Sequence, residues 1–143
     1  MGFTGDLMGG LAALLAARGV GAYNPSGAYT AAQTGIVHDV VPSSPDRVIV
    51  LTPYSPTDDP TLSDSVVRVQ VRVRGTRDPR TAYDLDDAAF QVLHNLPRQT
   101  IGGAVVTGGW RRSGAYIGPD SNGRHERTSN YEFQVHRPTE HRT

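Results

Sequence analysis

One segment of the chain alternates hydrophobic and polar residues without interruption, "VVRVQVRVRG" at positions 66–75. Successive side chains of a strand point to opposite faces, so this pattern produces one valine face and one face of arginine and glutamine. The helical period of about 3.6 residues does not explain a repeat of two. We therefore predict a strand from Val66 to Arg74, with a buried face made of Val67, Val69, Val71 and Val73.

The N-terminal apolar segment has helical spacing. Leucines recur on one side of a helix over residues 7–15, which favours a helix that Thr4 or Gly5 caps and that ends before Gly19. The adjacent glycines at 9–10 each cost about 1 kcal/mol relative to alanine in a helix interior. We therefore expect another element to pack closely against them.

A second helix is predicted directly after the alternating strand. Thr76 or Asp78 can cap it, Pro79 suits its first turn, and Pro97 ends it. Its apolar stripe consists of Ala82, Leu85, Ala89, Val92, Leu93 and Leu96. This stripe is expected to pack on the valine face, which leaves the arginine face uncovered within one subunit.

The rest of the chain predicts strands joined by sizeable loops. Alternating and β-branched residues indicate strands at 36–41, 47–54, 99–110 and 129–135. Polar, proline-rich or glycine-rich segments indicate loops at 23–34, 55–64 and 111–127. The C-terminal segment "HRPTEHRT" has no apolar anchor, so we expect 135–143 to form a flexible tail. The order of elements predicts the α+β class, with one domain over residues 1–143 and a mainly antiparallel β-sheet packed against two α-helices.

Composition narrows the possible functions. Basic and acidic residues balance at 14 each, so the chain lacks the bulk positive charge of a dedicated nucleic-acid binder. It has no cysteine, which excludes disulfides, thiol catalysis and zinc sites with sulfur ligands. The N-terminal apolar run is too short to span a bilayer, and Asp6 stands where a signal peptide would carry positive charge. We expect a soluble, intracellular protein with no membrane partner.

The polar residues do not assemble a recognisable catalytic or metal site. The five histidines are scattered and show no spacing of a zinc site. The loop from Asp120 resembles part of a calcium loop, but Tyr131 stands where the bidentate glutamate belongs. Adjacent carboxylates, as in the pairs at 58–59 and 86–87, point in different directions. We therefore expect no catalytic residue, no metal and no cofactor.

The arginines leave three interpretations open. Arg68, Arg72 and Arg74 lie on one predicted sheet face, and a further arginine pair at 111–112 follows Trp110. The face is either solvated, or part of a nucleic-acid groove, or an interface between identical subunits. In an interface, the arginines would pair with carboxylates of a neighbour, such as those of "TDDP" or "DLDD".

The order of elements resembles the minor capsid (neck) and tail terminator proteins of long-tailed bacteriophages. The shared features are a short N-terminal helix, the strand "VVRVQVRVRG", a helix with the pattern A-x-x-L-x-x-x-A-x-x-V-L from Ala82 to Leu93, and two closing strands. The most specific piece is "VQVRVRGTRDPRTAYDLDDAAFQVLHNL". The predicted loops at 55–64 and 111–127 are longer than those of compact family members.

The resemblance implies a virion structural protein and no enzyme. Such proteins form a ring, expected here to be a homo-hexamer, at the head-proximal end of the tail tube. The ring ends tube growth and joins tail to head at the neck, so the implied partners are the tail tube protein and a head-completion or connector protein. Genomic DNA would pass through the lumen without sequence-specific binding. The protein would be found in the virion, and in the host cytoplasm during assembly.

In such a ring, the candidate interface or lumen-facing residues are Arg68, Gln70, Arg72, Arg74, Arg111 and Arg112. Asp58 and Asp59 mark a candidate inter-subunit loop. Three alternatives remain open: a head-completion or head-tail connector protein, a small nucleic-acid-binding module that uses the arginine face, and an enzyme whose site forms only between subunits.

Overall fold

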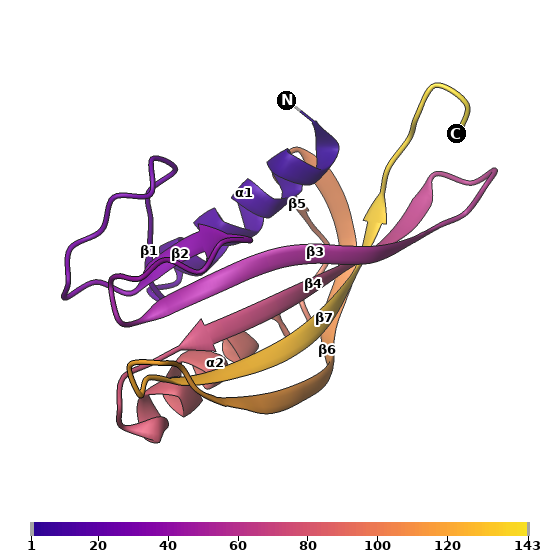
Figure 1. Cartoon of the computed structure of the whole chain (residues 1–143). Coiled ribbons are helices and arrows are strands. Elements are labelled where there is room, and N and C mark those ends of the chain that lie inside the picture. The colour runs from indigo at the N-terminus through magenta and orange to yellow at the C-terminus, as the bar shows by residue number, and fades with distance from the viewer. Residues whose placement is uncertain (1, 143) are drawn as a thin grey trace.

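In the computed structural model, which describes residues 2–142, seven strands form one sheet in the order β1-β2-β3-β4-β7-β6-β5. The sheet is strongly curled, and helices α1 and α2 lie against it (Figure 1). The helices are α1 (Phe3–Ala17) and α2 (Pro79–Leu93). The strands are β1 (Ala22–Tyr23), β2 (Gly35–His38), β3 (Val48–Asp58), β4 (Asp64–Arg74), β5 (Gln99–Ile101), β6 (Ala104–Pro119) and β7 (His125–His136). The α+β class and the mainly antiparallel sheet are as the sequence predicts.

Strand β4 lies in the centre of the sheet and has the predicted two faces. It pairs antiparallel with β3 on one side and with β7 on the other. The valine face is buried beneath both helices, in one cluster that includes Leu11 of α1 and Leu85 of α2. The aromatic residues Tyr131 and Phe133 of β7 complete this cluster. Burial of apolar side chains on this one face is the main force that holds helices and sheet together.

The two helices begin at different kinds of cap. Asp78 caps α2 as predicted, because its side chain accepts a hydrogen bond from the Arg80 backbone N–H and Pro79 occupies the first turn. Helix α1 starts earlier than predicted, at Phe3, with Gly2 at the N-cap position and no side-chain cap. The caps proposed at Thr4 and Gly5 are therefore wrong. Packing decides this start, since Phe3 lies against the core and Arg137 stacks over its ring at 4.5 Å.

The predicted close approach to the glycines of α1 is confirmed at Gly10. A Cβ at this position would lie 2.5 Å from the backbone nitrogen of Gly102, in the turn between β5 and β6. At Gly9 the nearest atom outside the helix would be the Tyr23 hydroxyl, at 3.8 Å. Helix α1 is thus pressed against the β5–β6 turn at one glycine and not at the other.

Two predicted loops are in fact paired strands. Residues 55–58 extend β3, and β4 begins at Asp64, so the segment predicted as a loop at 55–64 is a hairpin that continues the sheet. We call residues 54–64 the hairpin arm. A register shift between Tyr54 and Thr57 absorbs the local irregularity. Likewise 111–119 belong to β6 and pair with β7 from His125 onward. Backbone pairing makes both segments strands. Their proline, glycine and charged residues do not alternate with apolar residues, so the side chains do not indicate this pairing.

The N-terminal edge of the sheet also differs from the prediction. Strand β2 ends at His38 rather than at 41, because the chain turns at Asp39 with a φ of 60°. Residues 22–23, at the start of a predicted loop, form the edge strand β1. Strands β1, β2 and β3 run parallel to one another, whereas the remaining pairs are antiparallel.

Part of the segment for which a flexible tail is predicted, 135–143, pairs with the sheet or contacts the hairpin arm. Val135 and His136 are the last residues of β7. Arg142 is buried, and its guanidinium donates to the carbonyl oxygens of Asp59 and Arg137 and to the Ser65 hydroxyl. One arginine thus ties the tail to the hairpin arm, and Thr143 lies outside the described residues. No helix within 2–142 is both long and apolar enough to cross a membrane.

Candidate interaction surface

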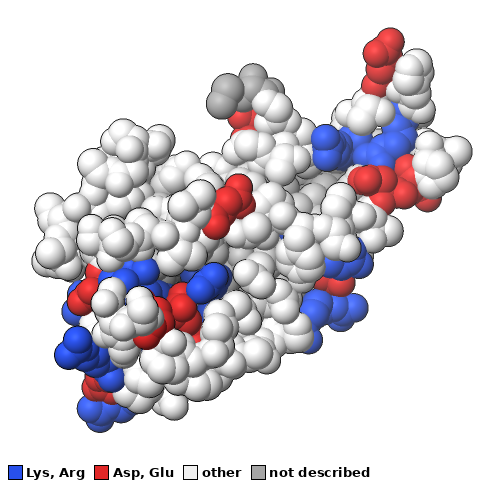
Figure 2. All heavy atoms as spheres, in the orientation of Figure 1, with Lys and Arg blue, Asp and Glu red and all other residues white. Residues whose placement is uncertain are grey.

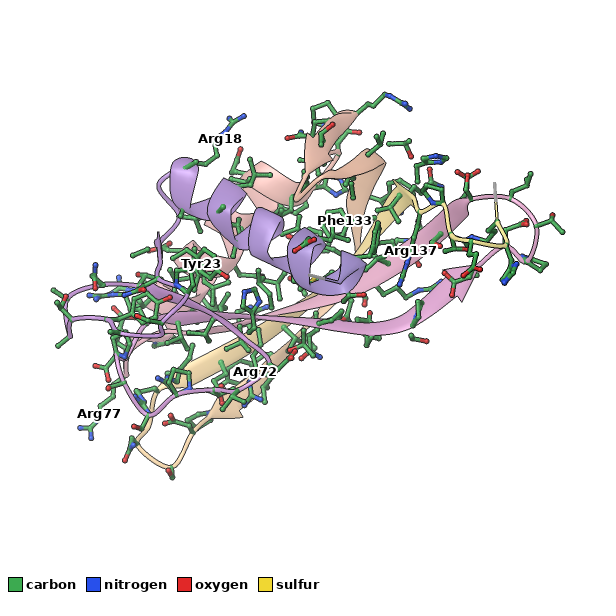
Figure 3. All side chains as sticks on the ribbon, turned by 90° about the horizontal axis from the view of Figure 1, so that it is seen from above. Arg18, Tyr23, Arg72, Arg77, Phe133 and Arg137 are labelled. Atoms are coloured by element: carbon green, nitrogen blue, oxygen red, sulfur yellow. The ribbon has the colours of Figure 1, made fainter. Side chains whose placement is uncertain are left out.

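Arg68, Gln70 and Arg72 lie on the face of β4 that points away from the helices. We call the surface that these three residues form the charged face. Figure 3 shows Phe133 beside helix α1 and Arg72 farther from it. Strand β7 places Glu132 directly opposite Arg68. The sequence thus predicts which side chains share this face, but it does not show which carboxylates meet them.

Glu132 holds two arginines from different strands. Its Oε1 atom lies 3.1 Å from Nε of Arg68, and its Oε2 atom lies 3.2 Å from Nε of Arg112. Arg68 also donates to the Ser55 carbonyl oxygen at 2.6 Å and to the Thr57 hydroxyl at 2.9 Å. The guanidinium of Arg68 therefore has its partners within its own chain, at the base of the hairpin arm.

Arg72 is neutralised in the same way. Its Nε and Nη2 atoms donate to the two carboxylate oxygens of Glu126, at 2.9 and 3.0 Å. This two-bond geometry is the strongest that an arginine and a carboxylate form. Glu126 is only 5% exposed, so the pair is partly shielded from solvent. Figure 2 likewise shows acidic and basic side chains close together, with no continuous basic patch on the face drawn.

Arg74 does not contribute to the charged face as a surface residue. It is 3% exposed, and its guanidinium donates to the carbonyl oxygens of Pro42 and Pro45 at 2.7 Å and of Asp46 at 2.9 Å. Burial, together with the nearby Arg124, lowers the pKa of Arg74 from its ordinary value. Arg74 thus holds the loop before β3 against the sheet. We leave it out of the interaction surface for this reason.

The side chains of Arg111 and Arg112 lie on opposite faces of the sheet. Arg112 lies over the Trp110 ring, with 5.5 Å to the centroid, and pairs with Glu132 of the sheet. Arg111 stacks on Phe90 of helix α2 at 4.2 Å and is thereby on the helix side. Adjacent side chains of a strand point to opposite faces, so one sequence pair serves two surfaces.

The carboxylates of Asp58 and Asp59 shape the hairpin arm. Asp58 accepts a hydrogen bond from the Ser65 hydroxyl at 2.6 Å and lies 3.8 Å from Nη1 of Arg142. Asp59 accepts from the backbone N–H groups of Leu62 at 2.7 Å and Thr61 at 2.9 Å. These backbone bonds, above all the one from Leu62, lower the pKa of Asp59. The acidic pair predicted for an inter-subunit loop therefore lies at an ordered, projecting turn.

A cleft of about 360 Å³ between α2 and β6 holds a side-chain cluster around Asp86 that the sequence pattern does not predict. Asp86 accepts from the Ser129 hydroxyl at 2.7 Å, and Arg111 and Arg127 lie 3.8 and 4.0 Å from its Oδ2 atom. We call this cleft between α2 and β6 the β6 cleft. Burial, and then the Asp86 carboxylate, raise the pKa of Tyr131. One sequence feature could have indicated this cluster: helical spacing places Asp86 beside the apolar stripe of the helix rather than on its solvated side.

Metal-binding groups do not gather in the part of the chain described here. Across residues 2–142, no three histidine, aspartate or glutamate side chains come together in a group that could hold a metal ion. The features that stand out instead are the charged face, the β6 cleft and the hairpin arm. Each of the three lies on a different part of the subunit surface.

Residues 14–137 match a family model described as bacteriophage tail terminator protein. The chain belongs to the bacteriophage tail terminator family. The resemblance noted in the sequence is therefore confirmed over most of the chain. No curated protein matches the sequence well enough to count as a relative.

A solved structure shares this fold. This terminator-family protein is similar to a chain in the virion of a native gene transfer agent (GTA) particle, with a TM-score of 0.58 and 14% sequence identity. The likeness covers 91% of this chain and 97% of that chain. At this identity the comparison shows a shared fold over nearly the full length of both proteins.

Proposed function

We propose that this terminator-family protein forms a ring of identical subunits, expected to be a hexamer, at the head-proximal end of the phage tail tube. The ring ends tube growth and joins tail to head, through contacts with the tail tube protein and with a head-completion or connector protein. The observation that carries this proposal is the match to the terminator family over residues 14–137. The protein would lie at the neck of the virion, and in the host cytoplasm before assembly.

The proposed mechanism relies on complementary shape and charge, with no covalent step. A ring requires each subunit to present two different patches that fit one another, so that the contact repeats until it closes. The hairpin arm and the β6 cleft are two such patches with different shapes and opposite charge. The ring then needs no chemistry beyond binding.

The charged face suits a surface past which DNA slides. Each phosphate that a free arginine neutralises adds affinity and releases counterions, so a bare basic face would retain DNA. Here Glu132 and Glu126 already occupy the guanidinium groups of Arg68 and Arg72. We propose that this face lines the lumen or a subunit boundary. The same pairing weakens the alternative of a small nucleic-acid-binding module.

Electron microscopy of the purified protein mixed with tail tubes tests the proposal. We expect rings in solution, or caps on one end of each tube, and tubes that no longer lengthen when tube protein is added. Light scattering after size-exclusion chromatography gives the number of subunits. A protein that remains monomeric and leaves the tubes uncapped would overturn the proposal.

A further inference from the structure

The geometry points to one specific contact within this ring: the hairpin arm of one subunit docks on the open edge of β6, beside the β6 cleft, of the next subunit. The inference rests on the proposed ring and names the surfaces that close it. Four observations support it, namely an open strand edge, a local excess of positive charge, a projecting acidic arm, and the separation of arm and edge within one subunit.

Beyond its first residues, the outer edge of β6 has no strand partner in the described part of the chain. Strand β5 pairs only with Ala104, Val105 and Val106. A bridge from Leu96 to Gly109 and a bond from the Arg111 N–H to His94 follow. All side chains from 112 to 117 are exposed. An open edge of this kind presents N–H and C=O groups to another chain.

A second exposed edge, along the outer part of β3, is less suited to pairing. The outer part of β3 contains Pro53 and Pro56, which have no N–H to donate. Strand β6 contains no proline before Pro119. Register shifts interrupt its pairing with β7, as is common at the edges of sheets. The β6 edge is therefore the better docking site of the two.

The β6 cleft carries more positive than negative charge. Arg111 and Arg127 share the single carboxylate of Asp86, at distances too long for direct hydrogen bonds. Arg127 lies over the rings of Tyr83 and Tyr116 and is thereby held at the mouth of the cleft. A carboxylate from outside can therefore bind here with both guanidinium groups already in place.

The hairpin arm has the complementary chemistry. It carries three carboxylates, of which Asp64 is 77% exposed at its side chain. Leu62 is 59% exposed at the turn. On the β6 edge, Tyr116 and Ile117 are about half exposed, at 50% and 48%. The arm thus combines an apolar tip with acids, and the edge combines apolar side chains with arginines.

The arm and the open edge lie at opposite ends of the sheet, so they cannot meet within one chain. Asp64 of β4 pairs with His136, whereas Ala115 of β6 pairs with Thr128, which in turn pairs with Arg72. The eight residue steps from Asp64 to Arg72 span about 27 Å of strand. Figure 1 shows the arm at the end of the sheet that lies opposite to α2. A contact between two such different patches repeats head to tail, as a closed ring requires.

Cysteine cross-linking tests the contact, because the natural chain has no cysteine. We would combine Thr61→Cys, on the exposed turn of the arm, with Ala115→Cys in one chain and oxidise it under ring-forming conditions. We expect a ladder of multimers on a denaturing gel that ends at the ring's subunit number and collapses on reduction. Each single variant should give at most a dimer. The matched control joins Thr61→Cys to Ala31→Cys, on an exposed loop outside the proposed contact, and should give no ladder.

Charge reversal provides a second measurement. Asp64→Arg alone and Arg127→Asp alone should each lower the fraction of protein in rings at least tenfold, and their combination should restore it. Circular dichroism checks that each variant remains folded. Rings that form without a ladder, and without loss in either charge variant, would overturn the arm-to-edge contact and leave the ring itself intact. If the unaltered protein forms neither rings nor tube caps, the proposed function fails instead.

Discussion

Arg72 of β4 and Glu126 of β7 form a two-bond ion pair, with Nε to Oε1 at 2.9 Å and Nη2 to Oε2 at 3.0 Å. The pair explains why the most arginine-rich strand of this protein does not form a basic patch. A strand pattern shows which face its arginines occupy. Only the neighbouring strand shows whether those arginines are available to a ligand.

Removal of a carboxylate from the charged face should make it bind DNA. We expect Glu126→Gln to raise the affinity for nonspecific duplex DNA at low salt, because Arg72 loses its counter-charge. The variant should also be less stable by about 1–2 kcal/mol, since a hydrogen bond between charged groups is lost. Fluorescence anisotropy at several salt concentrations measures the affinity. Glu140→Gln, which removes an exposed glutamate elsewhere, is the control and should leave both quantities unchanged.

Arg74 and Arg68 lie on the same face of β4, but their replacement by alanine should change the free energy of unfolding by different amounts. We expect Arg74→Ala to reduce the free energy of unfolding by about 3 kcal/mol, because three backbone carbonyl oxygens, of which that of Pro45 is in a buried hydrogen bond, lose their donor. Arg68→Ala removes a partly exposed ion pair and should cost about 1 kcal/mol or less. Urea denaturation compares the two variants. Equal losses would show that Arg74 does not hold the loop as described.

The adjacent glycines of α1 offer a matched pair of substitutions. Gly9→Ala should stabilise the protein by about 0.5–1 kcal/mol, because alanine favours a helix and the added Cβ meets nothing closer than 3.8 Å. Gly10→Ala should destabilise it, because the same Cβ would lie 2.5 Å from the Gly102 backbone. Thermal unfolding followed by circular dichroism decides the sign of each change. A gain in stability at both positions would contradict the close approach of α1 to the β5–β6 turn.

The Asp78 cap of α2 predicts that the stability of the folded state depends on pH. Bonds from the Arg80 side chain and backbone hold the pKa of Asp78 below its ordinary value of 3.8. A carboxyl whose pKa is lowered by folding stabilises the folded state above its ordinary pKa, and this contribution is lost as the pH falls through the folded pKa. Any advantage of the wild type over Asp78→Asn should therefore be largest near neutral pH and should shrink below about pH 3.8.

Urea titrations at about pH 7 and about pH 3 measure this difference. Asparagine is a suitable replacement because it can still cap the helix but carries no charge. A stability difference between the two proteins that is the same at both pH values would rule out a role for the Asp78 charge.

Part of the charged face could be predicted and part could not. Alternation placed Arg68 and Arg72 together because the period of a strand is a local property. Their partners Glu132 and Glu126 are more than 50 residues away in the sequence. No local pattern contains that pairing. The same limit applies to Asp86, whose contact with Ser129 joins α2 to β7.

The hairpin arm and β6 illustrate the other kind of error. Both segments are rich in residues that disfavour strands, and a side-chain pattern therefore indicates loops. Backbone hydrogen bonds to β4 and β7 make them strands all the same. Such bonds form between any two aligned chains, whatever side chains those chains carry.

The sequence by itself determined the central strand, the α2 helix, the α+β class and, through resemblance, the terminator family. Each of these depends on local periodicity or on a short ordered pattern. Tertiary structure alone decided that Arg74 is buried, that Arg111 and Arg112 serve different surfaces, that Arg142 ties the tail to the arm, and that a long edge of β6 stays open. These features depend on which distant segments pack together, because burial and ion pairing are properties of the folded chain as a whole.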